Sequence, residues 1–377
     1  LDNVFFSLVR NGLFALAIIQ IFIAKKRPSR FIVLIAGYYF MLHLITASNG
    51  NFYLNDIILN IKVVVYIWYL NNLCDSHPKE TLKCFWWIIF TLCVSNFLSV
   101  LIFPKGIYVT ESFIDIWHGY YSVSNWIFGN KNTQACWYLL LVLLSHLSMT
   151  INRKWNYLLT IFIAVISVCN MILVDSSTSI FVLGMAAIGL LISYRNNRRF
   201  KFNINTHFIM VAYLAINFLV VTGSAFFLEP LVQTLFGKDL NFSGRGSVVW
   251  PAVFLFISQK PIFGQGIIDA SKAGELMQNV ALVNAHNQIL QILWQGGIVQ
   301  FSYVAVIFSR IARSINRIEK KQFKLFICIV LCAFLIDTIF EVVSSGYIFI
   351  ILLYMINKSS ELLDKTHGLG GLYQNEQ

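Results

Sequence analysis

The amino-acid sequence predicts an all-α, polytopic helical membrane protein, and two observations lead to this fold class. The chain has 377 residues, of which 58% are hydrophobic and 12% are charged, and its mean hydropathy is +0.70. Soluble domains are about 25% charged. The apolar residues also gather in runs close to the roughly 20 residues that a helix needs to cross a bilayer. We therefore expect several membrane-spanning helices and the lipid bilayer as a partner.

About 11 transmembrane helices are expected, because polar or charged segments separate the apolar runs. These runs cover residues 4–24, 31–47, 56–73, 84–103, 134–150, 157–174, 176–194, 207–229, 288–309, 324–341 and 345–357. The two long loops are residues 104–133 and residues 230–287, and the second lies before the ninth helix. Residues 1–357 are expected to form one polytopic membrane domain. Residues 358–377, which contain three glycines, are expected to form a flexible cytoplasmic tail.

The basic residues predict the orientation of these helices. Segments on one side of the membrane hold 20 of the 28 Lys and Arg residues, and the alternating loops hold six. Cytoplasmic loops are enriched in Lys and Arg, so the sequence places both long loops on the extracytoplasmic face. The basic residues lie in short clusters between apolar runs and not along one stripe. The net charge of +11 therefore does not indicate a nucleic-acid partner.

No metal and no cofactor are expected. The seven cysteines include no Cys-x-x-Cys pair, and the sequence has no Asp-x-Asp motif. Cys93, Cys169, Cys328 and Cys332 lie inside apolar runs, where a thiol usually packs as a small apolar side chain.

Three ionisable residues, Arg10, Lys62 and Asp337, fall well inside predicted spans. A charge at mid-bilayer costs about 2.5–3.5 kcal/mol, so each needs a partner or a hydrated cavity. Glu341 follows Asp337 by four residues and shares its helix face. Two interpretations remain open. The cations reach the membrane interface while the acids form internal ion pairs, or all four residues line an outward-facing cavity and contact an anionic ligand.

The loop 230–287 contains an arginine flanked by glycines, Arg245, just before an apolar stretch that begins at Trp250. Glycine lets the backbone approach a ligand closely, and a guanidinium binds phosphate through two parallel hydrogen bonds. Arg245 is therefore a candidate phosphate ligand, and the alternative is an interfacial anchor beside Trp250. Further along the loop, Pro261-x-x-Gly264-x-Gly266 predicts a turn.

His286 and Asn287 lie directly before the ninth span. A neutral imidazole can accept a proton from a sugar hydroxyl, and an asparagine can orient either partner. His286 is thus a candidate catalytic base and Asn287 a candidate substrate ligand, although a single loop histidine is more often structural. Glu111, Asp115 and His118 in the first long loop are weaker candidates.

Three sequence elements follow one another along the chain. They are Phe128-Gly129-Asn130-Lys131-Asn132 before the fifth span; Asp175-Ser176-Ser177-Thr178-Ser179 before the seventh; and Gly244-Arg245, Trp250, Pro261, Gly264-x-Gly266, Ala285-His286-Asn287, Leu290 and Gly296-Gly297 around the ninth. In this order and with this hydropathy layout, they resemble the O-antigen ligase/polymerase superfamily, which joins Wzy-type polymerases to O-antigen ligases. The resemblance adds Asn130, Asn132, Asp175 and Ser177 as candidate substrate-binding residues.

The chain departs from the pattern of this superfamily in two places. The element at Asp175 has no arginine where the family tends to carry Ser-Arg-Thr, and the spacing from Arg245 to Trp250 is one residue longer than usual. The phosphate contact of the missing arginine is expected to come from Arg10 or Lys62. Eleven spans instead of twelve would fit a missing first helix.

The resemblance implies a membrane glycosyltransferase at the outer face of the bacterial inner membrane. It would act as an O-antigen or capsule polymerase, which transfers growing glycan from undecaprenyl pyrophosphate onto a new lipid-linked repeat unit. His286 would be the base, and Arg245 with the membrane-embedded cations would hold the pyrophosphate. A chain-length regulator protein is a further expected partner. The alternatives are an O-antigen ligase that transfers glycan to lipid A–core, and a flippase or transporter of lipid-linked oligosaccharide.

Overall fold

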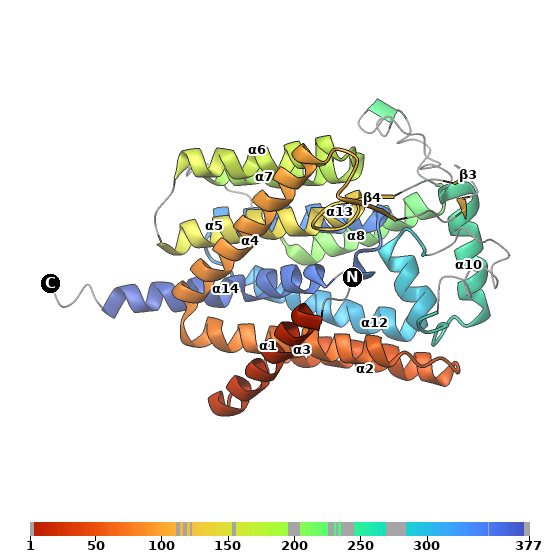
Figure 1. The fold of residues 1–377 in the computed structure, drawn as a ribbon, viewed down its shortest axis with the longest axis horizontal. Coiled ribbons are helices and arrows are strands. Elements are labelled where there is room, and N and C mark those ends of the chain that lie inside the picture. Colours follow the sequence, from red (N-terminus) through yellow and green to blue (C-terminus); the bar gives the residue numbers. More distant parts are fainter. Residues whose placement is uncertain are drawn as a thin grey trace.

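The computed structural model describes residues 4–110, 114–115, 119–120, 123–152, 156–194, 204–224, 230, 233–234, 245–268, 284–345 and 347–372. Within these ranges the chain forms a bundle of long helices, and most of them run along one common direction (Figure 1). The long helices are α1 (Val4–Ala24), α2 (Arg30–Ser48), α3 (Leu54–Ser76), α4 (Pro78–Ile102), α5 (Ala135–Asn152), α6 (Tyr157–Leu173), α7 (Ser177–Tyr194), α8 (Thr206–Val221), α12 (Gln288–Asn316), α13 (Lys321–Phe340) and α14 (Ile348–Leu372). Each corresponds to one predicted span, in the same order, which confirms the all-α polytopic fold class.

Short elements connect these helices. Strand β1 (Tyr108–Thr110) pairs antiparallel with β4 (Val123–Asn125), and β2 (Ile114–Asp115) pairs with β3 (Gly119–Tyr120). The 3-10 turn η1 (Lys131–Thr133) precedes α5, and the turn η4 (Val343–Ser345) joins α13 to α14. Before α12, the π-helical turn η3 (Arg245–Val249) continues into α10 (Trp250–Gln259).

The helices have the length and composition of membrane spans. In the described part of the chain, α1, α2, α3, α4, α5 with η1, α12 and α13 are long and apolar enough to cross a membrane. Helices α6, α7 and α8 are shorter but apolar. The chain is therefore a multi-pass membrane protein.

Local sequence signals set the ends of helix α8. At its start, Asn205 Oδ1 accepts a hydrogen bond from the backbone N–H of His207 at 3.0 Å, a common way to begin a helix. At its end, Gly223 adopts a φ of 69°, which glycine tolerates and which stops the helix after Val221. The span predicted to reach residue 229 is therefore shorter in the structure.

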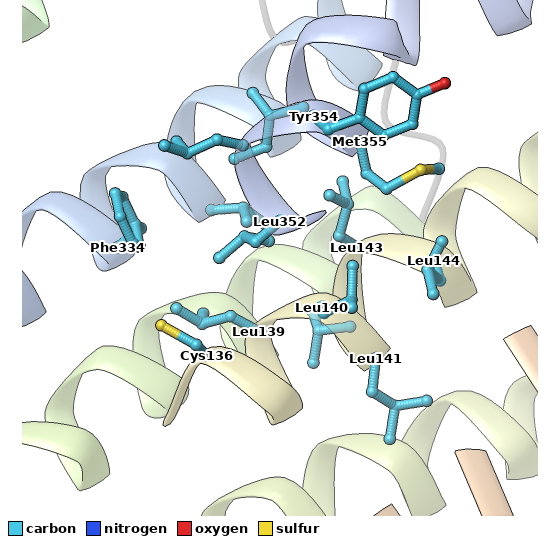
Figure 2. Packing of buried hydrophobic residues seen from close by; sticks show 14 of the residues in the cluster. Cys136, Leu139, Leu140, Leu141, Leu143, Leu144, Phe334, Leu352, Tyr354 and Met355 are labelled. Atoms are coloured by element: carbon cyan, nitrogen blue, oxygen red, sulfur yellow. The ribbon is translucent and has the colours of Figure 1, made fainter. Parts of the chain in front are cut away.

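Helix α5 forms the centre of the bundle. The side chains of residues 139–144 have no exposed surface, although they point in all directions around the helix. The helix packs against α4, α14, α7 and α13. Figure 2 shows Leu143 of α5 beside Met355 of α14, whereas Leu141 points away from α14. Protein thus surrounds α5 on every side.

Helix α1 is the opposite case, because it lies at the edge of the bundle. It packs mainly against α3, and only 11% of its apolar segment Ser7–Ala24 is buried. Leu13 is 56% exposed and Phe22 is 75% exposed. In a membrane these side chains face the lipid.

The last helix corrects a predicted boundary. Helix α14 continues to Leu372, whereas the sequence predicted a span that ends at residue 357 and a flexible tail. The Lys358 side chain is only 4% exposed, and its ammonium lies 2.8 Å from Asp75 Oδ1 and also pairs with Glu361. Because these carboxylates neutralise the lysine, the charge that was expected to end the helix is accommodated within it. Leu362 and Leu363 are buried beyond it and continue the apolar face.

The loop 230–287 contains a helix that the sequence reading did not predict. Trp250, Val253 and Phe256 of α10 are buried at helical spacing. Helix α10 has ten residues, which is too short for a span. It lies across one end of the bundle, and the C-terminus lies at the opposite end (Figure 1). We call the end that carries α10 the α10 end.

Candidate functional site

A small apolar cluster holds the segment that carries Arg245. Trp250 and Val253 of α10 have no exposed surface, and they pack with Val220 and Val221 of α8, Leu290 and Trp294 of α12, and Ile339 of α13. Phe256 and Trp294 meet edge to face, with their ring centroids 5.2 Å apart. This packing places the turn η3 beside the end of α13.

The guanidinium of Arg245 binds the end of α13. Its Nη1 donates a hydrogen bond to the Phe340 carbonyl oxygen at 2.6 Å, and its Nη2 lies 3.2 Å from Glu341 Oε1. The side chains of Arg245 and Glu341 are 20% and 13% exposed. Carbonyl groups at a helix C-terminus lack helical partners and carry partial negative charge, so they stabilise a cation. A guanidinium has five N–H donors, and these two contacts use only part of that capacity.

Asn287 connects the start of α12 to the end of α13. Its Oδ1 accepts a hydrogen bond from the backbone N–H of Leu290 at 2.9 Å and so caps α12. Its Nδ2 donates to the Ile339 carbonyl oxygen at 2.8 Å. The side chain has no exposed surface. Asn287 therefore fixes the relative position of the two helix ends that flank Arg245.

His286 has an unusual backbone conformation. Its φ is 47°, in the left-handed region that residues other than glycine adopt rarely. The backbone N–H of His286 donates to Asn284 Oδ1 at 2.8 Å, which helps to hold this conformation. Such strained residues are found often at functional sites. The half-buried imidazole is thereby placed at the start of α12.

Asp337 lies one helical turn before Glu341, and the Glu341 N–H donates to the Asp337 carbonyl oxygen at 2.9 Å. The Asp337 side chain has no exposed surface. Within the described residues, neither of its carboxyl oxygens has a hydrogen-bond partner. Buried polar groups are nearly always hydrogen-bonded, so a buried carboxyl group without a hydrogen bond is unusual, and it lies one turn from the Arg245–Glu341 pair.

The structure thus brings five predicted candidates together at the α10 end. We call them the α12–α13 site: Arg245, His286, Asn287, Asp337 and Glu341. The site combines a guanidinium, an imidazole and two carboxyl groups at the ends of membrane-spanning helices. Such a set contains the groups needed to neutralise an anion and to accept a proton.

The predicted turn Pro261-x-x-Gly264-x-Gly266 packs against a break in α12. At the break, Gly297 has φ 59° and ψ −161°, which is not helical. Backbone hydrogen bonds of 2.8 to 3.1 Å join residues 261–266 to residues 294–299. A Cβ atom on Gly297 would lie 2.3 Å from the Ile262 carbonyl oxygen, so only glycine permits this approach. The turn therefore supports the segment of α12 that begins at Asn287.

The other candidates from the family resemblance meet in a separate group. The Lys131 ammonium donates to the Asp175 carbonyl oxygen at 3.0 Å. Asn130 Oδ1 accepts from the N–H of Asn132 at 3.1 Å and caps η1. Ser177 is the first residue of α7. These contacts join the start of α5 to the α6–α7 connection, and none of them reaches the α12–α13 site.

Three buried amides near this group were missed by the sequence reading. Gln134 Oε1 accepts from Asn96 Nδ2 at 2.9 Å and from Asn170 Nδ2 at 2.7 Å, and all three side chains have no exposed surface. Asn96 Oδ1 also accepts from the Phe128 N–H at 3.0 Å. The signal was present, because these amides stand in or at the edge of apolar runs, where a polar group needs a partner. Their network joins α4, α5 and α6.

Arg10 and Lys62 lie in the α1–α3 pair. The Lys62 ammonium donates to Asn11 Oδ1 at 2.8 Å and lies 5.7 Å from the ring centroid of Phe14. The Arg10 carbonyl oxygen accepts from the Tyr66 hydroxyl at 3.2 Å. None of these contacts involves Arg245 or Glu341, so the structure does not bring the two cations to the α12–α13 site.

Some candidates cannot be placed. Glu111, His118 and Gly244 lie outside the described residues, and Asp115 belongs to the short strand β2. Among the described residues, no group of three His, Cys, Asp or Glu side chains could hold a metal ion.

Residues 162–305 match the family model described as O-Antigen ligase. No curated protein and no solved structure matches the chain. The matched segment includes Arg245, His286 and Asn287 of the α12–α13 site. This match supports the resemblance of the chain to the O-antigen ligase/polymerase superfamily.

Proposed function

We propose that the protein is a membrane glycosyltransferase of the polymerase type. It transfers a growing O-antigen or capsular glycan from undecaprenyl pyrophosphate onto a new lipid-linked repeat unit. The observation that carries this proposal is the meeting of Arg245, His286 and two carboxyl groups at the ends of α12 and α13. In the proposed reaction, these side chains contact the phosphates and the sugar of the lipid-linked substrate.

The reaction requires a base and a group that stabilises the leaving pyrophosphate. The acceptor hydroxyl oxygen forms a bond to the anomeric carbon of the donor glycan. The bond from that carbon to the pyrophosphate oxygen breaks, and its electron pair leaves with the pyrophosphate. The imidazole of His286 takes the hydroxyl proton, and Arg245 stabilises the charge that develops on the leaving group.

The contacts of Arg245 support its role as a pyrophosphate ligand. The Phe340 carbonyl oxygen holds one edge of the guanidinium, and Glu341 neutralises its charge in the absence of substrate. A pyrophosphate can bind the remaining donors or displace the Glu341 carboxylate. Glu341 in this view is a positioning residue, which keeps the arginine aimed at the site between turnovers.

The distribution of basic residues supports an extracytoplasmic position for the site. Arg310, Arg313, Arg317 and Lys358 lie toward the end of the bundle opposite the α10 end. Because basic residues mark the cytoplasmic side, the α10 end faces outward. In the bacterial inner membrane, this is the face on which we expect the lipid-linked repeat units and, with them, a chain-length regulator.

An O-antigen ligase is the second candidate, and the description of the matching family favours it. The same site would then transfer finished glycan to lipid A–core. Both reactions use a polyprenyl-pyrophosphate donor and need the same base and cation. The two functions therefore differ in the acceptor and not in the chemistry proposed for Arg245 and His286.

Deletion of the gene separates the candidates by the glycan that remains. Loss of a polymerase leaves a single repeat unit on the final acceptor. Loss of a ligase leaves long glycan on the lipid carrier, and loss of a flippase leaves neither form at the surface. Gel electrophoresis of the surface glycan and analysis of the extracted carrier lipid distinguish these outcomes. Any pattern other than the single repeat unit contradicts the polymerase proposal.

A further inference from the structure

A cavity of about 240 Å³ lies between α2, α8, α12, α13 and α14. Its walls are almost entirely apolar, with side chains such as Met210 and Leu214 of α8, Phe301 and Val304 of α12, and Leu353 of α14. The cavity is partly open at the surface of the bundle. A hydrocarbon chain fits such walls, whereas a sugar would leave its hydroxyl groups without partners.

One end of the cavity adjoins the α12–α13 site. Thr338 and Gln288 line the cavity. The next residue on α13 after Thr338 is Ile339, which binds Asn287, and the two after it bind Arg245. On α12, Gln288 directly follows Asn287. Since one residue advances a helix by about 1.5 Å, the apolar cavity begins where the polar site ends.

From this end the cavity extends along the bundle. On α12 the lining residues continue beyond the break at Gly297, from Phe301 to Ser309, which is roughly 12 Å of helix axis. On α8 they extend back to His207, close to the start of that helix. The cavity therefore leads from the α12–α13 site toward the opposite face of the membrane.

We propose that this cavity binds the polyprenyl chain of the donor while Arg245 binds its pyrophosphate. The inference rests on the proposed function, because it names where the lipid part of that substrate lies. The donor has a polar pyrophosphate at the membrane surface and a long hydrocarbon chain below it. The protein has its polar site and its apolar cavity in the same order. The partly open side gives the chain a route in from the bilayer.

A bulky residue in the wall tests the proposal. Ala305 lines the cavity, so Ala305→Phe fills part of it. Ser302 lies on the same helix, is exposed and does not line the cavity, so Ser302→Phe is the matched control. The full chain in liposomes is assayed with glycan donors on undecaprenyl and on farnesyl pyrophosphate. The acceptor is kept the same throughout.

We expect wild-type protein and Ser302→Phe to prefer the long-chain donor. In Ala305→Phe, kcat/KM for the undecaprenyl donor falls roughly tenfold or more, because several buried methylene groups lose their contacts. The kcat/KM of Ala305→Phe for the farnesyl donor changes little, and this remaining activity shows that the variant is folded. An equal loss with both donors, or no loss with either, overturns the proposal.

A binding experiment keeps this test separate from the proposed function. A farnesyl pyrophosphate with a photoreactive group in its chain is cross-linked to wild-type protein, and the labelled peptides are mapped. We expect labels on α8 and α12 that undecaprenyl pyrophosphate removes and phosphatidylglycerol does not. Removal by phosphatidylglycerol as well would assign the cavity to an ordinary bilayer lipid. Specific labelling without any glycan transfer would leave the cavity proposal standing and contradict the polymerase function.

Discussion

His286 combines a strained backbone with a position at the start of α12, and it is the proposed base. A positioned base contributes about 10²–10⁴-fold to a rate. We therefore expect His286→Ala to reduce polymerisation by that order while protein level and membrane insertion stay normal. His286→Gln keeps a hydrogen-bonding side chain but cannot take the proton, so it should fail almost as completely. Chain length on a gel measures both variants, and near-normal chains from the glutamine variant would make His286 a positioning residue.

Arg245 touches both a helix-end carbonyl and a carboxylate, and this geometry requires a planar group with several donors. Lysine keeps the charge but has no fork, so we expect Arg245→Lys to shorten the glycan chains. Arg245→Ala should reduce the rate of transfer by about 10²–10³-fold, the usual effect of losing a donor to a developing anion. The rate is measured with purified protein and lipid-linked donor. A normal rate for the alanine variant would return Arg245 to the role of an interfacial anchor.

At the scale of the elements, the turn 261–266 and the break in α12 form one support for the site. Gly297→Ala places a Cβ atom against the Ile262 carbonyl and demands a conformation that alanine avoids. Such strain costs about 1–3 kcal/mol. We expect a lower midpoint of thermal unfolding in detergent and reduced activity. Gly184→Ala in α7 is the control, because no atom lies within 4 Å of its added Cβ and alanine favours a helix. Equal midpoints for the two variants would contradict this view of the break.

The elements also show what the sequence can and cannot predict. Spans were predictable because a chain in lipid must satisfy its backbone within each helix, which requires long apolar runs. Helix α10 was not predicted, because its ten residues are too few to span a bilayer. The end of α14 was misjudged because the partner of Lys358, Asp75, lies 283 residues away. Candidate residues could be chosen from the sequence by their type. The pairing of Arg245 with Glu341 could not be predicted, because the two residues are far apart in the sequence.

At the scale of the whole molecule, the orientation in the membrane is open to direct measurement. Cys84 is exposed and is first replaced by serine. Ser258→Cys on α10 and Glu319→Cys between α12 and α13 both place a thiol on the surface. We expect a membrane-impermeant maleimide to label position 258 in intact cells, and position 319 only after the membrane is opened. The reverse pattern would place the α12–α13 site on the cytoplasmic side and would contradict the proposed reaction.

The enclosure of α5 has a consequence for how the protein is made. In the finished molecule this helix is surrounded by α4, α7, α13 and α14. During synthesis, however, α13 and α14 emerge from the ribosome long after α5 has entered the bilayer. Until then, lipid must occupy the sides that they will cover. Lipid tails are as apolar as leucine. A helix with leucines on all sides is therefore stable both in lipid and in the protein interior. The apolar surface of α5 thus stabilises the helix in lipid before α13 and α14 are inserted, and it stabilises the packed bundle afterwards.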